Sequence, residues 1–473
     1  MDLRCLGSII LGEPCIDGKR VTSKVTLTHL DGTESGFELQ ISYEGQALEK
    51  YLPLYRLATT MPLLNYGLFA DEIRLDFEIS ESDLDLLNDL LDVFSKDIFV
   101  NKLVRRRTRH LDEKSLPKDD EVTEENARPL AKMRVKNVSK DNLLVDAFDK
   151  NKCGILSSGG KEALLTYSML KEAGAEAHPL YVNESGGHWR TALTAYRWHS
   201  RTEPNTGRVW TNVDRFYTFM LDNLRIVNYA HRRIPGDTYP IRLCIFPVYV
   251  FMLLPVFAER RIGNLLIGSE FDDPRGEWTL RGIRHYFGIY DQHQDFDARM
   301  ADWYAGRMPG MRQWSAVRSI SGLVVERILT SKYPEVAESQ RSCHSCHFEG
   351  DDIIPCGRCT KCLGVLLFLL ANGADPGRMG YPKADIDAFA TRLKDTAIRL
   401  DPDEYEHSRY LAKANGIDAD GNSHPHIEGV HIHPPTSDPG MVPESFRDKL
   451  DEIIVLYTNG RWILRNGEWY KAN

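Results

Sequence analysis

The residues best suited to chemistry lie where a short apolar stretch, Cys153–Leu156, runs into Ser157-Ser158-Gly159-Gly160. Adjacent glycines let a backbone turn tightly and approach an anion without a Cβ in the way. A helix is predicted to begin directly after them, so its free N–H groups and positive dipole end would face that anion. The hydroxyl groups of Ser157 and Ser158 supply further hydrogen-bond donors for the anion, and Lys161 supplies a positive charge. The segment predicts a phosphate-binding loop that is neither a Walker A nor a GxGxxG loop.

A second chemical pattern is a cluster of five of the nine cysteines. Clustered CxxC spacing favours a metal site over a disulfide framework. Cys356, Cys359 and Cys362 supply three thiolates, and the fourth comes from either Cys343 or Cys346. Four sulfurs in a tetrahedral arrangement predict a structural zinc (Zn2+) site closed to water, and an iron–sulfur cluster is the alternative.

The loop resembles the SGGxDS signature of the PP-loop ATP pyrophosphatase superfamily, whose members split ATP into AMP and pyrophosphate while adenylating a substrate. The match covers Ser158–Lys161 and departs at Glu162 and Ala163, where the family has Asp and Ser. Glu162 keeps a carboxylate, whereas Ala163 lacks a hydroxyl for the pyrophosphate.

The resemblance implies roles for particular residues and predicts ATP and Mg2+ as ligands. Lys161 and Glu162 would be catalytic. Asn183 ends the next predicted strand, which in this family helps to hold adenosine. Gly268 and Glu270 follow a later strand, with Asp272 and Asp273 beyond, similar to the family's acidic stretch. The implied ATP-binding set is Ser157, Ser158, Gly159, Gly160, Lys161, Asn183, Gly268 and Glu270.

The order of the loop and the cysteine cluster resembles two enzyme families in particular. In 7-cyano-7-deazaguanine synthase the cysteines run C-x8-C-x2-C-x2-C, a spacing that Cys346 nearly fits. The spacing that starts at Cys343 looks more like that of the ATP-dependent glycopeptidyl-glutamate epimerase, which also has an extra N-terminal domain. The resemblance covers roughly residues 152–375, about half of the chain.

Alternating strands and helices must position these residues. Strands are predicted at 153–156, 177–182, 209–210, 225–229 and 264–268, and helices at 160–172, 188–199 and 243–258. Repeated β-then-α order predicts a parallel sheet with helices on its faces, and ligands of such sheets bind at the carboxyl ends of the strands. We therefore expect an α/β fold: a parallel-sheet, Rossmann-like PP-loop core with an N-terminal α/β domain and a small C-terminal extension.

The composition shifts divide the chain into four parts. They are a mixed α/β domain (1–104), a charged linker (105–150), an ATP-binding domain with the cysteine knuckle (151–375) and a helical and loop extension (376–473). The basic run 105–110 could grip phosphates, although the acids that follow favour a solvated surface. Four histidines of the extension could bind metal or simply be exposed: His424, His426, His431 and His433.

Length and charge exclude several classes of protein. The 473 residues suggest about three domains. With 59 basic against 68 acidic residues, the net charge of −9 disfavours bulk nucleic-acid binding. The apolar segment 243–258 is too short and too rich in proline to span a membrane, and the N-terminus is too short for a signal peptide. We expect a cytoplasmic protein with no membrane segment.

The resemblance implies an enzyme acting on a small-molecule or peptide-like substrate. A carboxylate or carbonyl oxygen would attack the α-phosphate of ATP, and amide or nitrile formation or epimerisation would follow. The alternative is a catalytically reduced nucleotide-binding subunit of a nucleic-acid modification or defence system. The departures at Glu162 and Ala163 favour that alternative, with 105–109 as its contact to RNA or DNA.

Overall fold

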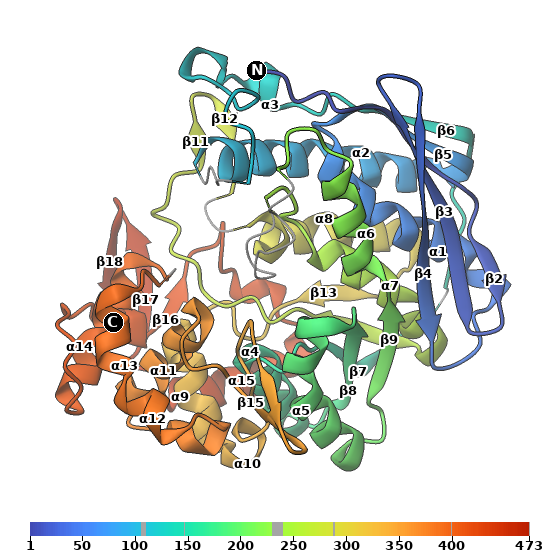
Figure 1. The fold of residues 1–473 in the computed structure, drawn as a ribbon. Helices are drawn as coiled ribbons and strands as arrows, with labels where there is room; N and C mark the ends of the chain where they lie inside the picture. The colour runs from blue at the N-terminus through green and yellow to red at the C-terminus, as the bar shows by residue number, and fades with distance from the viewer. Residues whose placement is uncertain (106–109, 146, 229–239, 287–288, 399, 473) are drawn as a thin grey trace.

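The computed structural model describes residues 1–105, 110–145, 147–228, 240–286, 289–398 and 400–472. Its centre is an eleven-stranded sheet with helices packed against it (Figure 1). The chain is α/β and its sheet is mostly parallel, which is compatible with a Rossmann-like core. The expected α/β class and the expected parallel sheet are thereby confirmed.

The parallel part of the sheet has the order β13-β10-β7-β8-β9. Its strands are β7 (Asp149–Leu156), β8 (Glu176–Asn183), β9 (Gly207–Thr211), β10 (Ile262–Leu266) and β13 (Arg312–Trp314). The connecting helices include α4 (Lys161–Glu172), α5 (Gly186–Thr202), α6 (Val213–Asp222) and α7 (Phe246–Arg260). All five residues of β10 are buried, as expected for a strand covered on both faces. The carboxyl ends of these strands meet at one edge. The predicted phosphate-binding loop, Ser157–Gly160, which we call the phosphate loop, lies at this edge.

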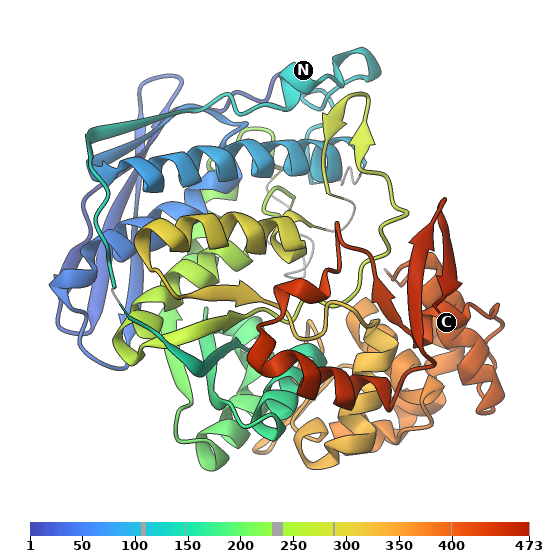
Figure 2. The same ribbon diagram turned by 180° about the vertical axis from the view of Figure 1, so that it is seen from behind.

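The N-terminal strands continue this same sheet. They are β1 (Leu6–Leu11), β2 (Cys15–Asp17), β3 (Arg20–His29), β4 (Glu34–Tyr43) and β5 (Ala70–Ser80), and β4 pairs antiparallel with β9. Alternate residues of β3 are buried, so its period of two lays one face on the core. Helices α1 (Leu52–Thr60) and α2 (Glu81–Ile98) pack against β5 of this part of the sheet. Figure 2 shows α2 beside α8 (Gln294–Arg307), where Asp83 accepts hydrogen bonds from Trp303 and Arg307.

Two segments differ from the expectation. Within 105–150, predicted as a charged linker, α3 (Glu124–Ala127) is followed by β6 (Lys132–Ser139), which pairs parallel with β5 at the sheet edge. Charged residues mask the alternating pattern because an edge strand exposes one face to water. Of the predicted strand 225–229, the described residues 225–228 contribute only an isolated bridge from Val227 to Leu111, and residue 229 lies outside the described ranges.

The basic run is described only at its two ends. The guanidinium of Arg105 pairs with the carboxylate of Glu277, and residues 106–109 lie outside the described ranges.

The remaining elements build the region around the cysteines and the C-terminus. They are β11 (Thr279–Leu280), β12 (Ile283–Arg284), α9 (Gly322–Lys332), α10 (Pro334–Ala337), β14 (His347–Glu349), β15 (Asp352–Ile354), α11 (Thr360–Ala371), α12 (Lys383–Asp387), α13 (Phe389–Asp395), α14 (Pro402–Ala414), β16 (Val430–Ile432), α15 (Glu444–Val455), β17 (Arg461–Arg465) and β18 (Glu468–Lys471). The hairpin β17–β18 turns at Asn466-Gly467, both with positive φ, as an Asn-Gly turn requires.

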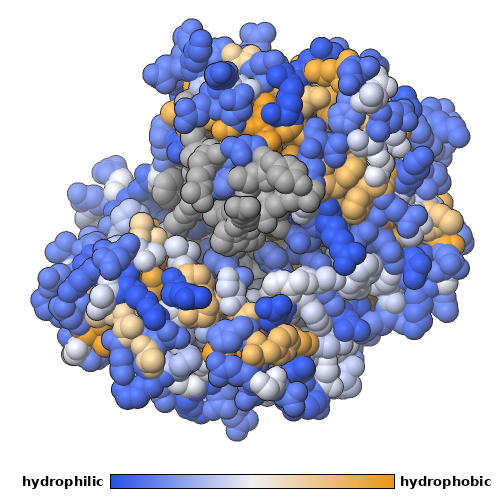
Figure 3. All heavy atoms as spheres, in the orientation of Figure 1, coloured by the Kyte–Doolittle hydropathy of each residue, from blue (hydrophilic) through white to orange (hydrophobic). Residues whose placement is uncertain are grey.

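Among the described residues, no helix is long and apolar enough to cross a lipid bilayer. The most apolar candidate, α7, is 15 residues long, contains Pro255 and packs on α1 in the core. The face in Figure 3 is mainly hydrophilic, with smaller apolar patches over the upper, N-terminal part of the molecule.

Candidate functional site

The phosphate loop has the strand–loop–helix geometry that its sequence predicts. Strand β7 ends at Leu156, and α4 begins at Lys161 with Gly160 as its N-cap residue. Gly159 has φ +77°, and a Cβ there would lie 3.2 Å from both Ala192 Cα and Ala195 Cβ of α5. Glycine is therefore required at 159 for conformation and for space. In the described structure no side chain caps α4, so its first N–H groups can bind an anion.

Lys161 lies between two carboxylates. Its side chain is 7% exposed, and its ammonium contacts the carboxylate of Glu162 and, at 2.8 Å, Oε2 of Glu270. Burial alone would lower the pKa of Lys161, but the two carboxylates raise it above its usual value. The lysine therefore stays charged and holds together the acids that end the loop and follow β10.

These residues open onto a cavity of about 580 Å³, a size typical of small-ligand sites. Five of the eight residues predicted to bind ATP line it, namely Ser157, Ser158, Gly160, Gly268 and Glu270, and the predicted catalytic residue Glu162 lines it as well.

 Basic side chains from four other segments also reach this cavity: Lys102, Arg242, Arg341 and Lys361.

Three predicted residues, among those described, lie outside the cavity lining. Gly159 packs against α5, and Lys161 lies beneath the two carboxylates. The side chain of Asn183 turns back, and its Oδ1 accepts a hydrogen bond from Ser185 N at 2.8 Å. Strand alternation instead directs Val182 and Glu184 to the cavity.

Glu184 and Arg242 are two further charged residues that line the cavity. Glu184 is 3% exposed, and its Oε2 accepts a hydrogen bond from the hydroxyl of Tyr249 at 2.7 Å. Arg242 lies 4.0 Å from the other carboxylate oxygen, with its guanidinium 4.5 Å from the ring centre of Tyr217. The alternation of β8 could have indicated Glu184, whereas only the fold brings Arg242 to it.

Further carboxyl groups are buried behind the loop. Burial raises the pKa of Glu270 to about 7 and that of Glu326 to about 7. In α14, burial and the nearby charges of Glu270 and Asp401 together raise the pKa of Glu404 to about 8. Oε1 of Glu404 accepts a hydrogen bond from Leu323 N at 3.1 Å. This concentration of carboxyl groups, with Lys161 as a charged neighbour, favours binding of a further cation.

Glu404→Gln should stabilise the protein increasingly as pH rises. The folded-state pKa of Glu404 is above its ordinary value of 4.5, so the wild type loses stability as pH rises from that value through the folded pKa. Glutamine stays neutral and can still accept the bond from Leu323. We expect its advantage in unfolding free energy to be at least about 1 kcal/mol larger at pH 9 than at pH 5, measured by urea unfolding. Glu406→Gln, on the same helix, should show no such trend.

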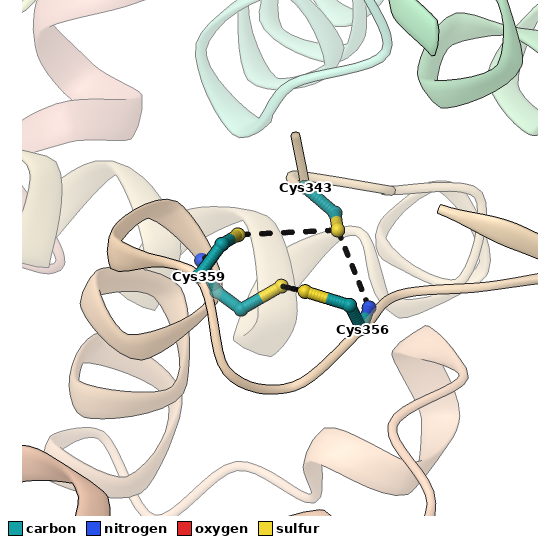
Figure 4. Close-up of side chains that lie close together, drawn as sticks. Cys343, Cys356 and Cys359 are labelled. Carbon is teal, nitrogen blue, oxygen red and sulfur yellow. Dashed lines mark hydrogen bonds between the residues drawn. The ribbon is translucent and has the colours of Figure 1, made fainter. Parts of the chain in front are cut away.

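Four cysteines form a group that could hold a metal ion such as zinc. The sulfurs of Cys343, Cys356, Cys359 and Cys362 all lie within 4.8 Å of one another. Two of the separations, Cys356–Cys362 and Cys343–Cys359, are 3.9 and 4.0 Å, close to the tetrahedral edge of about 3.8 Å that Zn–S bonds imply. Figure 4 shows the three labelled side chains pointing toward one another.

The structure selects Cys343 as the fourth member of this group. Cys346 lies outside it, and its sulfur lies 3.9 Å from the hydroxyl oxygen of Thr191. The hairpin β14–β15 lies between the two halves of the knuckle and returns the chain to Cys356.

The cysteine knuckle supports the phosphate loop. Thr191 of α5 donates to the carbonyl oxygen of Cys343 at 2.7 Å, and Arg341 N donates to the carbonyl oxygen of Gly159 at 3.2 Å. Cys343 also lines the cavity. A metal in the knuckle would therefore help to fix one wall of the cavity.

Comparison with known proteins adds no family to this geometry. No protein-family model matches the chain, and no curated protein matches it. The fold and the site define an α/β protein whose glycine loop opens, at the carboxyl edge of a sheet, onto a large cavity beside a four-cysteine knuckle.

Proposed function

We propose that the protein is an ATP-dependent enzyme that forms AMP and pyrophosphate while adenylating a carboxylate or carbonyl oxygen of a small-molecule or peptide-like substrate. The observation that carries this proposal is the uncapped N-terminus of α4 behind Gly160, opening onto the cavity of about 580 Å³. Amide or nitrile formation, or epimerisation, would follow the adenylation.

The cavity suits ATP in size, charge and polarity. The end of α4 and the basic side chains of Lys361 and Arg341 favour phosphates. Apolar residues of the wall, including Val182 and Ile267, suit a purine ring. A Cβ at Gly268 would lie 2.7 Å from Glu162 Cβ, so glycine lets this backbone approach the loop closely.

The donor set also suits Mg2+, which prefers carboxylate oxygens. The side chains of Glu162 and Glu270 are 27% and 28% exposed, and both line the cavity. When bound, Mg2+ would neutralise charge that develops on the pyrophosphate. Lys161 holds the two carboxylates in place for that ion.

The reaction requires one bond to form and one to break. A bond forms between the substrate oxygen and the α-phosphorus, while the bond from that phosphorus to the bridging oxygen of pyrophosphate breaks, and pyrophosphate leaves. The N–H groups at the start of α4 would stabilise the phosphate charge. Glu184 and Arg242, fixed by Tyr249 and Tyr217, would orient the substrate on the opposite wall.

Gly160→Asp should abolish ATP binding and turnover. A Cβ at this position would lie 2.9 Å from Glu162 Oε2, and the added carboxylate would repel phosphates. We expect at least about a 100-fold loss, the scale of removing one donor to a developing charge, in labelled-ATP binding and in AMP formation. The control is Gly306→Asp in α8, where a Cβ meets nothing within 4 Å among the described atoms. Unchanged ATP binding in Gly160→Asp would place the nucleotide elsewhere.

A further inference from the structure

A second group of metal-ligating side chains lies in the C-terminal extension, outside the proposed ATP site. It consists of Asp403 in the first turn of α14 and of His424 and His426 in the following loop, with ligand atoms within 4.8 Å of one another. Asp403 Oδ2 lies 3.0 Å from His426 Nε2 and 3.3 Å from His424 Nδ1. These spacings are close to the about 3.3 Å edge of a tetrahedral zinc site with N and O ligands.

A chain of contacts fixes which ring nitrogens carry hydrogen. His431 Nδ1 lies 3.2 Å from the carbonyl oxygen of Ser319, which can only accept, so Nδ1 carries the hydrogen. His431 is 0% exposed and stacks on Phe271 at 3.6 Å, a setting that disfavours a second proton. Its Nε2 must then accept from His426 Nδ1, 3.3 Å away.

The consequence is that His426 presents a lone pair to a carboxylate. With its hydrogen on Nδ1, the neutral ring has an acceptor at Nε2, and that atom faces Asp403 Oδ2, which is also an acceptor. A proton or a metal cation between them resolves this conflict. His426 is 6% exposed, which disfavours the imidazolium. Donation from the other ring nitrogen toward a backbone carbonyl, here relayed by His431, is typical of a metal-bound histidine.

One cation already contacts this group. Arg275 donates to Asp403 Oδ2 at 2.5 Å, and its Nε also donates to Asp273 Oδ1 at 2.9 Å. Asp273 therefore balances the guanidinium charge, and the charge of Asp403 remains for a second cation. His424, with a side chain 29% exposed, gives the site a path to solvent.

We propose that Asp403, His424 and His426 bind a divalent transition-metal ion, with zinc as the best-matched ion. Two imidazole nitrogens and one carboxylate oxygen suit zinc and leave one position open. The ion would fasten the start of α14 to the loop that carries His424 and His426. A separate contact already joins this end of α14 to the segment after β10, since Asp401 accepts a hydrogen bond from Asp273 N at 2.7 Å. This inference is independent of the proposed function.

The test is the zinc content of the purified full-length protein after incubation with Zn2+ and removal of free metal. We expect two zinc ions per chain, of which a thiol-modifying reagent releases only the one held by cysteines. His424→Gln should hold one, and that one should be released completely by the reagent. His433→Gln should hold two, because Nδ1 of His433 contacts the Thr436 hydroxyl instead.

Two results would overturn the proposal. One is a wild-type protein with a single zinc that the thiol reagent removes entirely, which would indicate an imidazolium–carboxylate pair at His426. The other is a second zinc that persists in both His424→Gln and Asp403→Asn. Because His424 is partly exposed, its variant should fold even if the Asp403 variant does not, and retention of the cysteine-bound zinc reports that it has folded.

Discussion

Cys359→Ser should release the metal of the cysteine knuckle and strongly destabilise the protein. Cys359 is both one of the four clustered thiols and the N-cap residue of α11, where its sulfur accepts from Cys362 N. Structural zinc contributes about 10–16 kcal/mol in zinc-finger peptides. We expect a loss of at least about 3 kcal/mol in unfolding free energy, together with loss of the knuckle's zinc.

The matched control is Cys346→Ser, which changes the fifth cysteine of the same segment. It should keep the zinc and unfold within about 1 kcal/mol of the wild type, because Cys346 lies outside the group of four. Metal analysis and denaturant unfolding measure both variants. Loss of zinc in Cys346→Ser with retention in Cys359→Ser would show that the assignment of the ligands is wrong.

Lys161→Met should destabilise the protein by about 3 kcal/mol and abolish AMP formation. It leaves the carboxylates of Glu162 and Glu270 facing each other with their shared cation removed, and breaking a buried ion pair on one side costs about 3–5 kcal/mol. The lower figure applies because both acids are partly exposed. Urea unfolding and the product assay measure the two effects.

A second substitution separates this charge effect from a packing effect. Glu270→Gln in the Lys161→Met background removes one of the two facing charges, so the double variant should be more stable than the single variant. The destabilisation should also shrink as pH falls below about 7, the pKa to which burial raises Glu270. A double variant no more stable than Lys161→Met would contradict the account of this cluster.

The phosphate loop and its flanking elements could be predicted from the sequence because their signals are local. The apolar run of β7, two glycines and the periodic pattern of α4 are contiguous, and the structure confirms the strand–loop–helix order. The turn at Asn466-Gly467 in the hairpin β17–β18 is likewise marked by a local signal, the dipeptide itself. Strand β6 was missed because charges on its exposed face hide the period of two.

Residues brought together by long-range packing could not be predicted. Glu404 reaches the loop region from α14, and Arg242 reaches Glu184 from a segment 58 residues further along the chain. Asn183 illustrates a limit of strand prediction. Successive side chains of β8 point to opposite faces of the sheet, so an error of one residue places a side chain on the face away from the cavity. The choice between Cys343 and Cys346 depends on the direction of the chain into β14, which cysteine spacing does not encode.

The most direct test of the central claim is to identify the products formed from ATP. The purified protein would be incubated with ATP, Mg2+ and a pooled metabolite extract, and AMP, ADP and pyrophosphate would be quantified beside the Gly160→Asp variant. The account predicts AMP and pyrophosphate in equal amounts, dependent on the extract and absent in the variant. Formation of ADP and phosphate instead would contradict attack at the α-phosphate.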